Sequence, residues 1–121
     1  MKLFALRGAA SVEENTEAAI LDATEQLLSA MMDRNALQPS DIVSCILTLT
    51  PDLDAQFPAV AARNIGFEQV PLLCAQEIAV DGSMPQVVRV MMHYHAPNGH
   101  KAQHIYLGRA TELRSDIDSA Q

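Results

Sequence analysis

The chain has 121 residues, of which 49% are apolar, so it is long enough to bury the core of one domain. Its formal net charge of −7, from 8 Lys and Arg against 15 Asp and Glu, argues against nucleic-acid binding, because a phosphate backbone requires a basic face. No window approaches the roughly 18 consecutive apolar residues of a membrane span, and the first residues lack the apolar region of a secretory signal, so we expect a cytoplasmic protein without a membrane partner.

The first predicted elements are a strand over residues 2–7, ending at Gly8, and a long helix. Asn15 or Thr16 can accept a hydrogen bond from the first turn of this helix, which should end near Arg34. Apolar residues recur along the helix at intervals of three and four, which predicts one apolar stripe that packs on a sheet. The stripe consists of Ile20, Leu21, Ala23, Leu27, Leu28, Met31 and Met32.

The middle of the chain predicts a buried strand followed by a short helix. Residues 42–50 read IVSCILTLT, and this β-branched and leucine-rich run favours a strand over a helix. Pro58 suits the start of a helix, where its missing N–H has no intrahelical partner to lose. The resulting short helix carries Arg63 and should end at Gly66.

Three more strands are expected in the second half of the chain, at about residues 69–78, 86–95 and 103–110. Turn sequences separate them, Asp-Gly-Ser at 81–83 and Pro-Asn-Gly at 97–99. The order of elements predicts an α+β fold in which a mixed β-sheet packs against the long helix.

No linker, repeat or low-complexity tract divides the chain, so we expect a single domain over residues 1–121 with a mobile polar tail at 115–121. The two cysteines, Cys45 and Cys74, each lie in an apolar strand-like run. Such positions are typical of reduced, buried thiols, so we expect no disulfide framework.

Arg89 is the charged residue that most needs a partner, because it lies inside the apolar strand VVRVMMHYH. A three-residue turn centred on Ser83 would place Glu77 opposite Arg89 in an antiparallel pair, although Pro85 would disturb the ladder. A structural ion pair on a sheet is the commoner arrangement and a catalytic pair the rarer one. The pattern alone leaves both interpretations open.

Other residues with catalytic potential give weaker signals. Four histidines, His93, His95, His100 and His104, could approach a metal, but their spacing matches no known zinc pattern and favours a hairpin with solvated histidines. Cys74 has no plausible base nearby, and the chain contains no phosphate-binding loop or nucleophile elbow. We therefore expect neither a metal nor a cofactor.

Five segments taken together are more specific than any of these features. They read LRGAASVEENTEAAI, LTPDLDAQFPAVAAR, VPLLCAQEIAVDG, VVRVMMHY and HIYLGRATELRSDI, and they span nearly the whole chain. In this order and spacing they resemble the monofunctional chorismate mutases of the AroH class. The resemblance implies a homotrimer with a pseudo-α/β-barrel core, an active site between neighbouring subunits, and the conversion of chorismate to prephenate in the shikimate pathway.

The resemblance also implies roles for individual residues. Arg7 matches an arginine that binds a substrate carboxylate, and Arg89 matches the arginine that donates to the ether oxygen of the substrate. Glu77 and Cys74 match residues that hold the ring hydroxyl group. Tyr106 matches a tyrosine that contacts a carboxylate. Phe57 and Ala59 match the wall of the cleft, and more peripheral positions near its entrance and tail match Arg63, Leu113 and Arg114.

Two positions depart from the family pattern, because Val60 replaces a lysine of some relatives and Ser115 replaces a common proline. Losing that lysine would weaken attraction of a dianionic substrate, and losing the proline would leave the tail more mobile. Both changes concern affinity more than the identity of the reaction.

The absence of catalytic motifs agrees with this activity, because the rearrangement of chorismate is intramolecular and requires no nucleophile, proton transfer, metal or cofactor. The leading alternative is a trimeric imine deaminase or small-molecule-binding protein of the RidA type, which shares the general fold. A third possibility is a catalytically silent assembly subunit of the same pathway.

Overall fold

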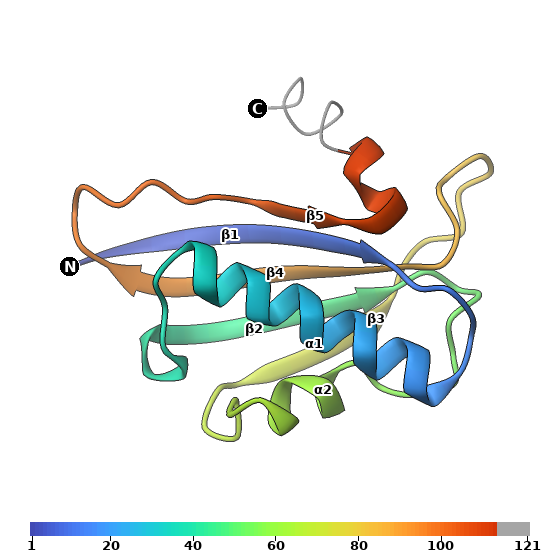
Figure 1. The fold of residues 1–121 in the computed structure, drawn as a ribbon, viewed down its shortest axis with the longest axis horizontal. Coiled ribbons are helices and arrows are strands. Elements are labelled where there is room, and N and C mark those ends of the chain that lie inside the picture. The colour runs from blue at the N-terminus through green and yellow to red at the C-terminus, as the bar shows by residue number, and fades with distance from the viewer. Residues whose placement is uncertain (114–121) are drawn as a thin grey trace.

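The computed structural model describes residues 1–113, in which a five-stranded sheet has the order β3-β2-β4-β1-β5 (Figure 1). The strands are β1 (Lys2–Ser11), β2 (Ile42–Leu49), β3 (Leu72–Gln76), β4 (Val87–Ala96) and β5 (Ile105–Leu107). The helices are α1 (Glu17–Arg34), α2 (Ala59–Asn64) and the 3₁₀ segments η1 (Pro39–Asp41) and η2 (Gly108–Leu113). The expected α+β fold with a mixed sheet and one long helix is therefore confirmed.

Strand β4 lies at the centre of the sheet and is antiparallel to both of its neighbours. It pairs with β1 from Lys2–Ala96 to Ser11–Val87, and with β2 on its other side. The edge strands are parallel to their neighbours, β3 to β2 and β5 to β1. Parallel neighbours require a crossover connection, and α2 lies in the one that joins β2 to β3.

Helix α1 begins and ends where the sequence indicates. Thr16 is its N-cap, and the Thr16 side chain accepts a hydrogen bond from the backbone N–H of Ala19 at 3.2 Å. The predicted stripe supplies most of the buried face, which consists of Ile20, Thr24, Leu27, Leu28, Met31 and Met32. The polar Thr24 is tolerated there because its hydroxyl donates to the carbonyl of Ile20 at 2.7 Å.

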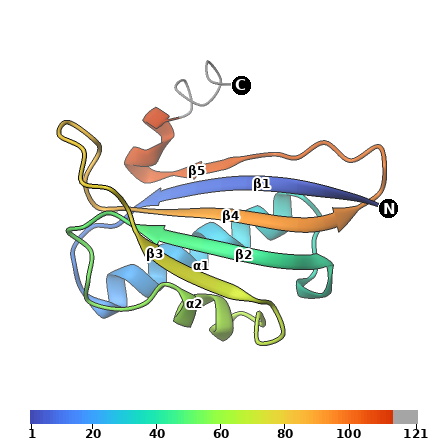
Figure 2. The ribbon, with the colours of Figure 1, turned by 180° about the vertical axis from the view of Figure 1, so that it is seen from behind.

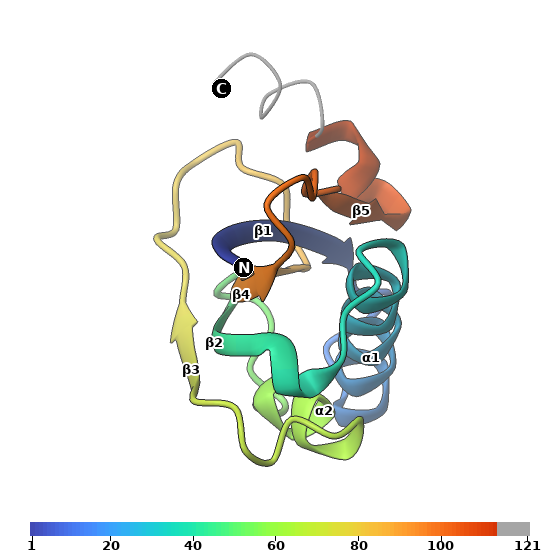
Figure 3. The same cartoon turned by 90° about the vertical axis from the view of Figure 1, so that its left-hand side faces the viewer.

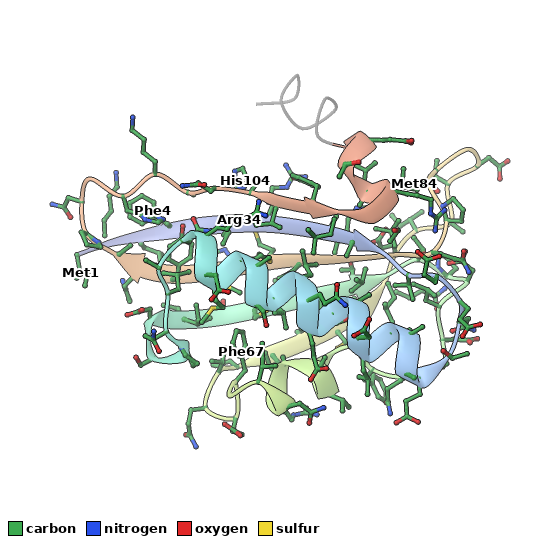
Figure 4. The ribbon with its side chains drawn as sticks, viewed as in Figure 1. Met1, Phe4, Arg34, Phe67, Met84 and His104 are labelled. Atoms are coloured by element: carbon green, nitrogen blue, oxygen red, sulfur yellow. The ribbon has the colours of Figure 1, made fainter. Side chains whose placement is uncertain are left out.

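Helix α2 ends at Asn64, and Gly66 terminates it as predicted. The N–H of Phe67 donates to the carbonyl of Ala62, and the N–H of Gly66 donates to that of Arg63. This Schellman pattern requires a left-handed residue after the helix, and Gly66 has φ +109°. The turn buries Phe67 in the main core, between α2 and the sheet (Figure 4).

Gly8 allows α1 to pack closely against the sheet. A Cβ at this position would lie 2.5 Å from Met31 Sδ and 3.1 Å from Leu27 Cδ1, and both side chains are fully buried. We predict that Gly8→Ala lowers the free energy of unfolding by about 1–2 kcal/mol through overpacking. Denaturant unfolding at one fixed protein concentration measures this change.

Gly99→Ala is the matched control for Gly8→Ala, because a Cβ at Gly99 meets no atom within 4 Å. Equal unfolding midpoints for the two variants would show that the contact between β1 and α1 is looser than the structure indicates.

Two predicted strand ends and one predicted strand pairing are wrong. Strand β1 continues past Gly8 to Ser11, because its backbone stays paired with β4. Residues 69–78 and 86–95 do not form a hairpin, since β2 lies between β3 and β4 in the sheet. Strand β5 stops at Leu107, and the chain then turns into η2. The predicted tail at 115–121 lies outside the described residues.

The two helices cover one face of the sheet, and the opposite face is open over much of its length (Figure 2). The chain between β3 and β4 runs on the side away from α1 (Figure 3). Met84 from this connection lies beside η2 (Figure 4). The connection and η2 together cover one end of the open face. They enclose a small second core of Ala9, Val87 and Ala110, packed against Met84, Tyr106 and Leu113.

Candidate active site

One row of paired residues crosses the sheet on the open face. Thr48 on β2 pairs with Arg89 on β4, which pairs with Ala9 on β1, which in turn pairs with Tyr106 on β5. Arg7 lies two residues before Ala9, so its side chain projects from the same face. The alternation of strand residues therefore brings together two arginines and a tyrosine that are far apart in the sequence.

These side chains line a hollow of about 160 Å³, which we call the arginine hollow. Its lining residues are Arg7, Gly8, Ala9, Ile46, Thr48, Arg89, Val90, Met91 and Tyr106. The two fixed positive charges stand among mainly apolar side chains in a protein of net charge −7. The arrangement is suited to a small organic anion, because guanidinium groups bind carboxylates in a planar fork.

Glu77 forms an ion pair with Arg89, in which Arg89 donates to Glu77 Oε1. The predicted antiparallel register between them is wrong, because Glu77 follows β3 and reaches Arg89 past β2. Its backbone N–H donates to the carbonyl of Leu49 at 2.8 Å, and its second carboxylate oxygen accepts from Thr48 Oγ1 at 2.6 Å. Sequence reasoning missed Thr48, although its alternation with Leu47 and Leu49 could have marked it as facing away from the core.

Phe57 and Cys74 belong to a different hollow of about 320 Å³, which we call the Phe57 hollow. Phe57 is 68% exposed, which is unusual for an aromatic side chain in a single chain. Ala59 is 5% exposed and belongs to the main core, whereas Arg63 is exposed on α2. Within one chain, therefore, these predicted site residues do not reach the arginine hollow.

A third hollow, of about 670 Å³, brings Leu113 close to Arg89. It is lined by Arg89, Arg109, Glu112, Leu113 and residues 82–85. Arg89 thus borders both this hollow and the arginine hollow. The predicted site residue Arg114 lies outside the described residues.

Three of the four histidines make specific contacts, whereas His95 is exposed. The backbone N–H of Arg7 donates to His104 Nδ1 at 3.0 Å, where β5 has not yet begun (Figure 4). Tyr94 Oη and His100 Nε2 lie 2.7 Å apart, and burial raises the pKa of the Tyr94 phenol. Ser44 Oγ lies 3.1 Å from His93 Nδ1. Within residues 1–113, no three His, Cys, Asp or Glu side chains gather as a metal site.

Cys45 is 1% exposed, and burial, together with the nearby Cys74, raises the pKa of its thiol to about 12. Because the thiolate is the reactive form, we predict that iodoacetamide at about pH 8 leaves Cys45 unmodified in the folded protein. Peptide mass spectrometry measures the modification, and the denatured protein is the control in which both cysteines react. Rapid modification of Cys45 in the native protein would contradict the burial described here.

In the described part of the chain, no helix combines the length and the apolar character that crossing a membrane requires. The family comparison is more informative, because the model of chorismate mutase type I matches residues 3–117. The chain belongs to the type I chorismate mutase family. The matched range includes every residue of the arginine hollow and of the Phe57 hollow.

Individual members of the family support this assignment. The chorismate mutase AroH of Thermus thermophilus is 44% identical over 118 residues, covering 96% of this chain and 97% of its own. That of Bacillus subtilis (strain 168) is 40% identical over 120 residues, covering 97% and 94%. The solved structure of a chorismate mutase from Clostridium thermocellum matches with a TM-score of 0.87 and 44% identity, over 91% of this chain and 99% of that one. The similarity thus extends through both sequence and fold.

Proposed function

We infer that this protein is a chorismate mutase, an isomerase that converts chorismate to prephenate in the biosynthesis of aromatic amino acids. The observation that carries this conclusion is the arginine hollow, in which Arg7, Arg89 and Tyr106 converge in a chain of this family. A RidA-type deaminase is not favoured, since the family match and the named relatives are chorismate mutases.

The hollow supplies what an intramolecular rearrangement requires. Chorismate carries two carboxylates, and Arg7 and Tyr106 would hold them so that the side chain of the substrate folds over its ring. Holding this conformer recovers part of the conformational entropy that the free substrate must lose before it reacts. No group of the protein needs to accept or donate a proton in this step.

Arg89 would act on the charge that develops during the reaction. As the C–O bond lengthens ahead of C–C bond formation, negative charge grows on the ether oxygen. A guanidinium fixed beside that oxygen binds the transition state more strongly than the ground state, which lowers the barrier. Glu77 would hold Arg89 in place and accept a hydrogen bond from the ring hydroxyl, with Cys74, brought by a neighbouring subunit, as a second contact to that group.

We propose further that the active unit is a homotrimer with a pseudo-barrel core, in which a neighbouring subunit brings its Phe57 hollow against the arginine hollow. Two observations support this arrangement. The arginine hollow and the Phe57 hollow are separate within one chain. Large apolar side chains are exposed on the open sheet face, on the β3–β4 connection and, at Phe57, in the Phe57 hollow, which is typical of an interface. They are Leu3, Phe57, Leu73, Ile78 and Val80.

This assembly would place Arg63, Ala59 and Leu113 around the entrance and wall of the shared cleft, with Arg114 beyond the described residues.

The two cysteines are unpaired, as expected for a protein of the reducing cytoplasm, where we propose that the enzyme acts.

The deciding experiment incubates the purified protein with chorismate and follows both the loss of chorismate absorbance and the formation of prephenate. Light scattering on the same sample, after size-exclusion chromatography, measures the oligomeric state. We expect prephenate formation by a trimer. Hydrolysis of 2-aminoacrylate without turnover of chorismate would favour the deaminase, and an inactive trimer that binds another enzyme of the pathway would indicate an assembly subunit.

A further inference from the structure

Thr48 faces the open side of the sheet, whereas its neighbours in sequence face the core. It lies on β2, between Ala75 of β3 and Arg89 of β4, and its side chain faces the arginine hollow. Leu47 and Leu49 on either side of it are buried in the main core. Ala75 and Ala9, the small residues of the same row, leave room around Thr48 and Arg89 on the open face.

The hydroxyl of Thr48 is directed at the carboxylate that pairs with Arg89. Thr48 Oγ1 donates to Glu77 Oε2 at 2.6 Å, while Arg89 donates to Glu77 Oε1. Each oxygen of the carboxylate thus has its own donor, and the donors come from two different strands. The β-branched side chain of Thr48 has restricted rotamers, so the direction of its hydroxyl is well defined.

Glu77 needs such an anchor because it lies beyond the end of a strand. Strand β3 ends at Gln76, and the backbone of Glu77 makes one further hydrogen bond, to Leu49. After it the chain leaves the sheet with exposed residues such as Ile78. A glutamate side chain has three rotatable bonds, so a carboxylate held only by Arg89 could move outward together with the guanidinium.

We propose that Thr48 is a positioning residue for the rearrangement, which fixes the Glu77 carboxylate and through it the guanidinium of Arg89 in the arginine hollow. Thr48 acts through Glu77 and needs no contact with the substrate. The inference rests on the proposed function and adds to it a residue that neither the sequence pattern nor the resemblance singles out.

The test compares Thr48→Val, which keeps the shape and removes the donor, with Thr48→Ser, which keeps the donor. We expect Thr48→Val to lower kcat by about three- to tenfold, the effect of losing one ordinary intramolecular hydrogen bond, with KM changed less than about twofold. Thr48→Ser should recover most of the lost kcat. A role confined to stability would lower the melting temperature and leave kcat unchanged.

Ser44→Ala is the matched control, because Ser44 lies on the same strand and its hydroxyl also bonds across to β4, at His93. We expect this variant to keep normal kinetics. The proposal is overturned if Thr48→Val keeps the kcat of the parent protein, if Thr48→Ser fails to recover it, or if Ser44→Ala loses as much. Those outcomes leave the proposed function intact, whereas a parent protein inactive on chorismate would overturn both.

Discussion

Replacement of Arg89 by alanine is expected to lower kcat by about 10²- to 10³-fold, by analogy with the loss of a preorganised donor from an oxyanion hole. The guanidinium borders the arginine hollow and is held by Glu77, so its charge is in place before the reaction begins. Steady-state kinetics with chorismate measure the loss. Size-exclusion chromatography and thermal unfolding check that the assembly and the fold are retained.

Two further variants test whether this loss is specific to the guanidinium of Arg89. Arg34→Ala removes an exposed arginine from the last turn of α1 and should leave kcat unchanged. Arg89→Lys keeps a positive charge but loses the planar fork, so it should recover only a small part of the activity. Near-normal turnover by Arg89→Ala would refute the role assigned to this residue.

Glu77→Gln is expected to lower kcat by about ten- to a hundredfold while the fold and the assembly remain intact. The amide can still accept from Arg89, but it lacks the charge that strengthens this bond. Stability should change little, because the Arg89 side chain is 36% exposed in the chain and such ion pairs contribute about 0–1 kcal/mol. Kinetics and thermal unfolding of the same preparation measure both quantities.

The purely structural interpretation of the Arg89–Glu77 pair gives the opposite result. A large fall in melting temperature together with an unchanged kcat would show that the pair holds the sheet and its connection together and has no part in the reaction. If Glu77→Gln lowered both the melting temperature and kcat substantially, the carboxylate would serve both the stability of the fold and the reaction.

Local sequence signals predicted the elements whose stabilising contacts are close in the chain. The N-cap at Thr16, the stripe of α1 and the Gly66 terminator all depend on residues within one or two helical turns. The run at 42–50 predicted β2, because a continuous apolar and β-branched segment suits a strand inside a sheet.

The order of the strands did not follow from the same signals. A short turn at 81–83 suggested a hairpin between β3 and β4, yet β3 is parallel to β2 and β4 pairs elsewhere. The predicted helix between residues 49 and 72 was the one signal for the parallel pairing of β2 and β3, because a helical connection allows two parallel strands. Alternation gives the face of a strand on which a residue lies, but it does not identify the neighbouring strand.

The residues of the candidate site were also predicted only in part. Resemblance to a family pointed to Arg7, Arg89 and Tyr106, and the structure brings these three side chains into one hollow. Thr48 was missed because its importance comes from a hydrogen bond to a residue 29 positions away. The same resemblance grouped Phe57 and Cys74 with the arginines, whereas the structure gives them a separate hollow within the chain.

By itself, the sequence determined the family of this protein, its α+β class, its long amphipathic helix and the residues that suit a small dianionic substrate. These features depend on residue type and short-range spacing. Only the tertiary structure decided that β4 lies between β1 and β2, so that Thr48, Arg89 and Tyr106 form one row and Glu77 reaches Arg89 from beyond β3. Pairing between distant strands depends on how the whole chain buries its apolar faces, which no local pattern specifies.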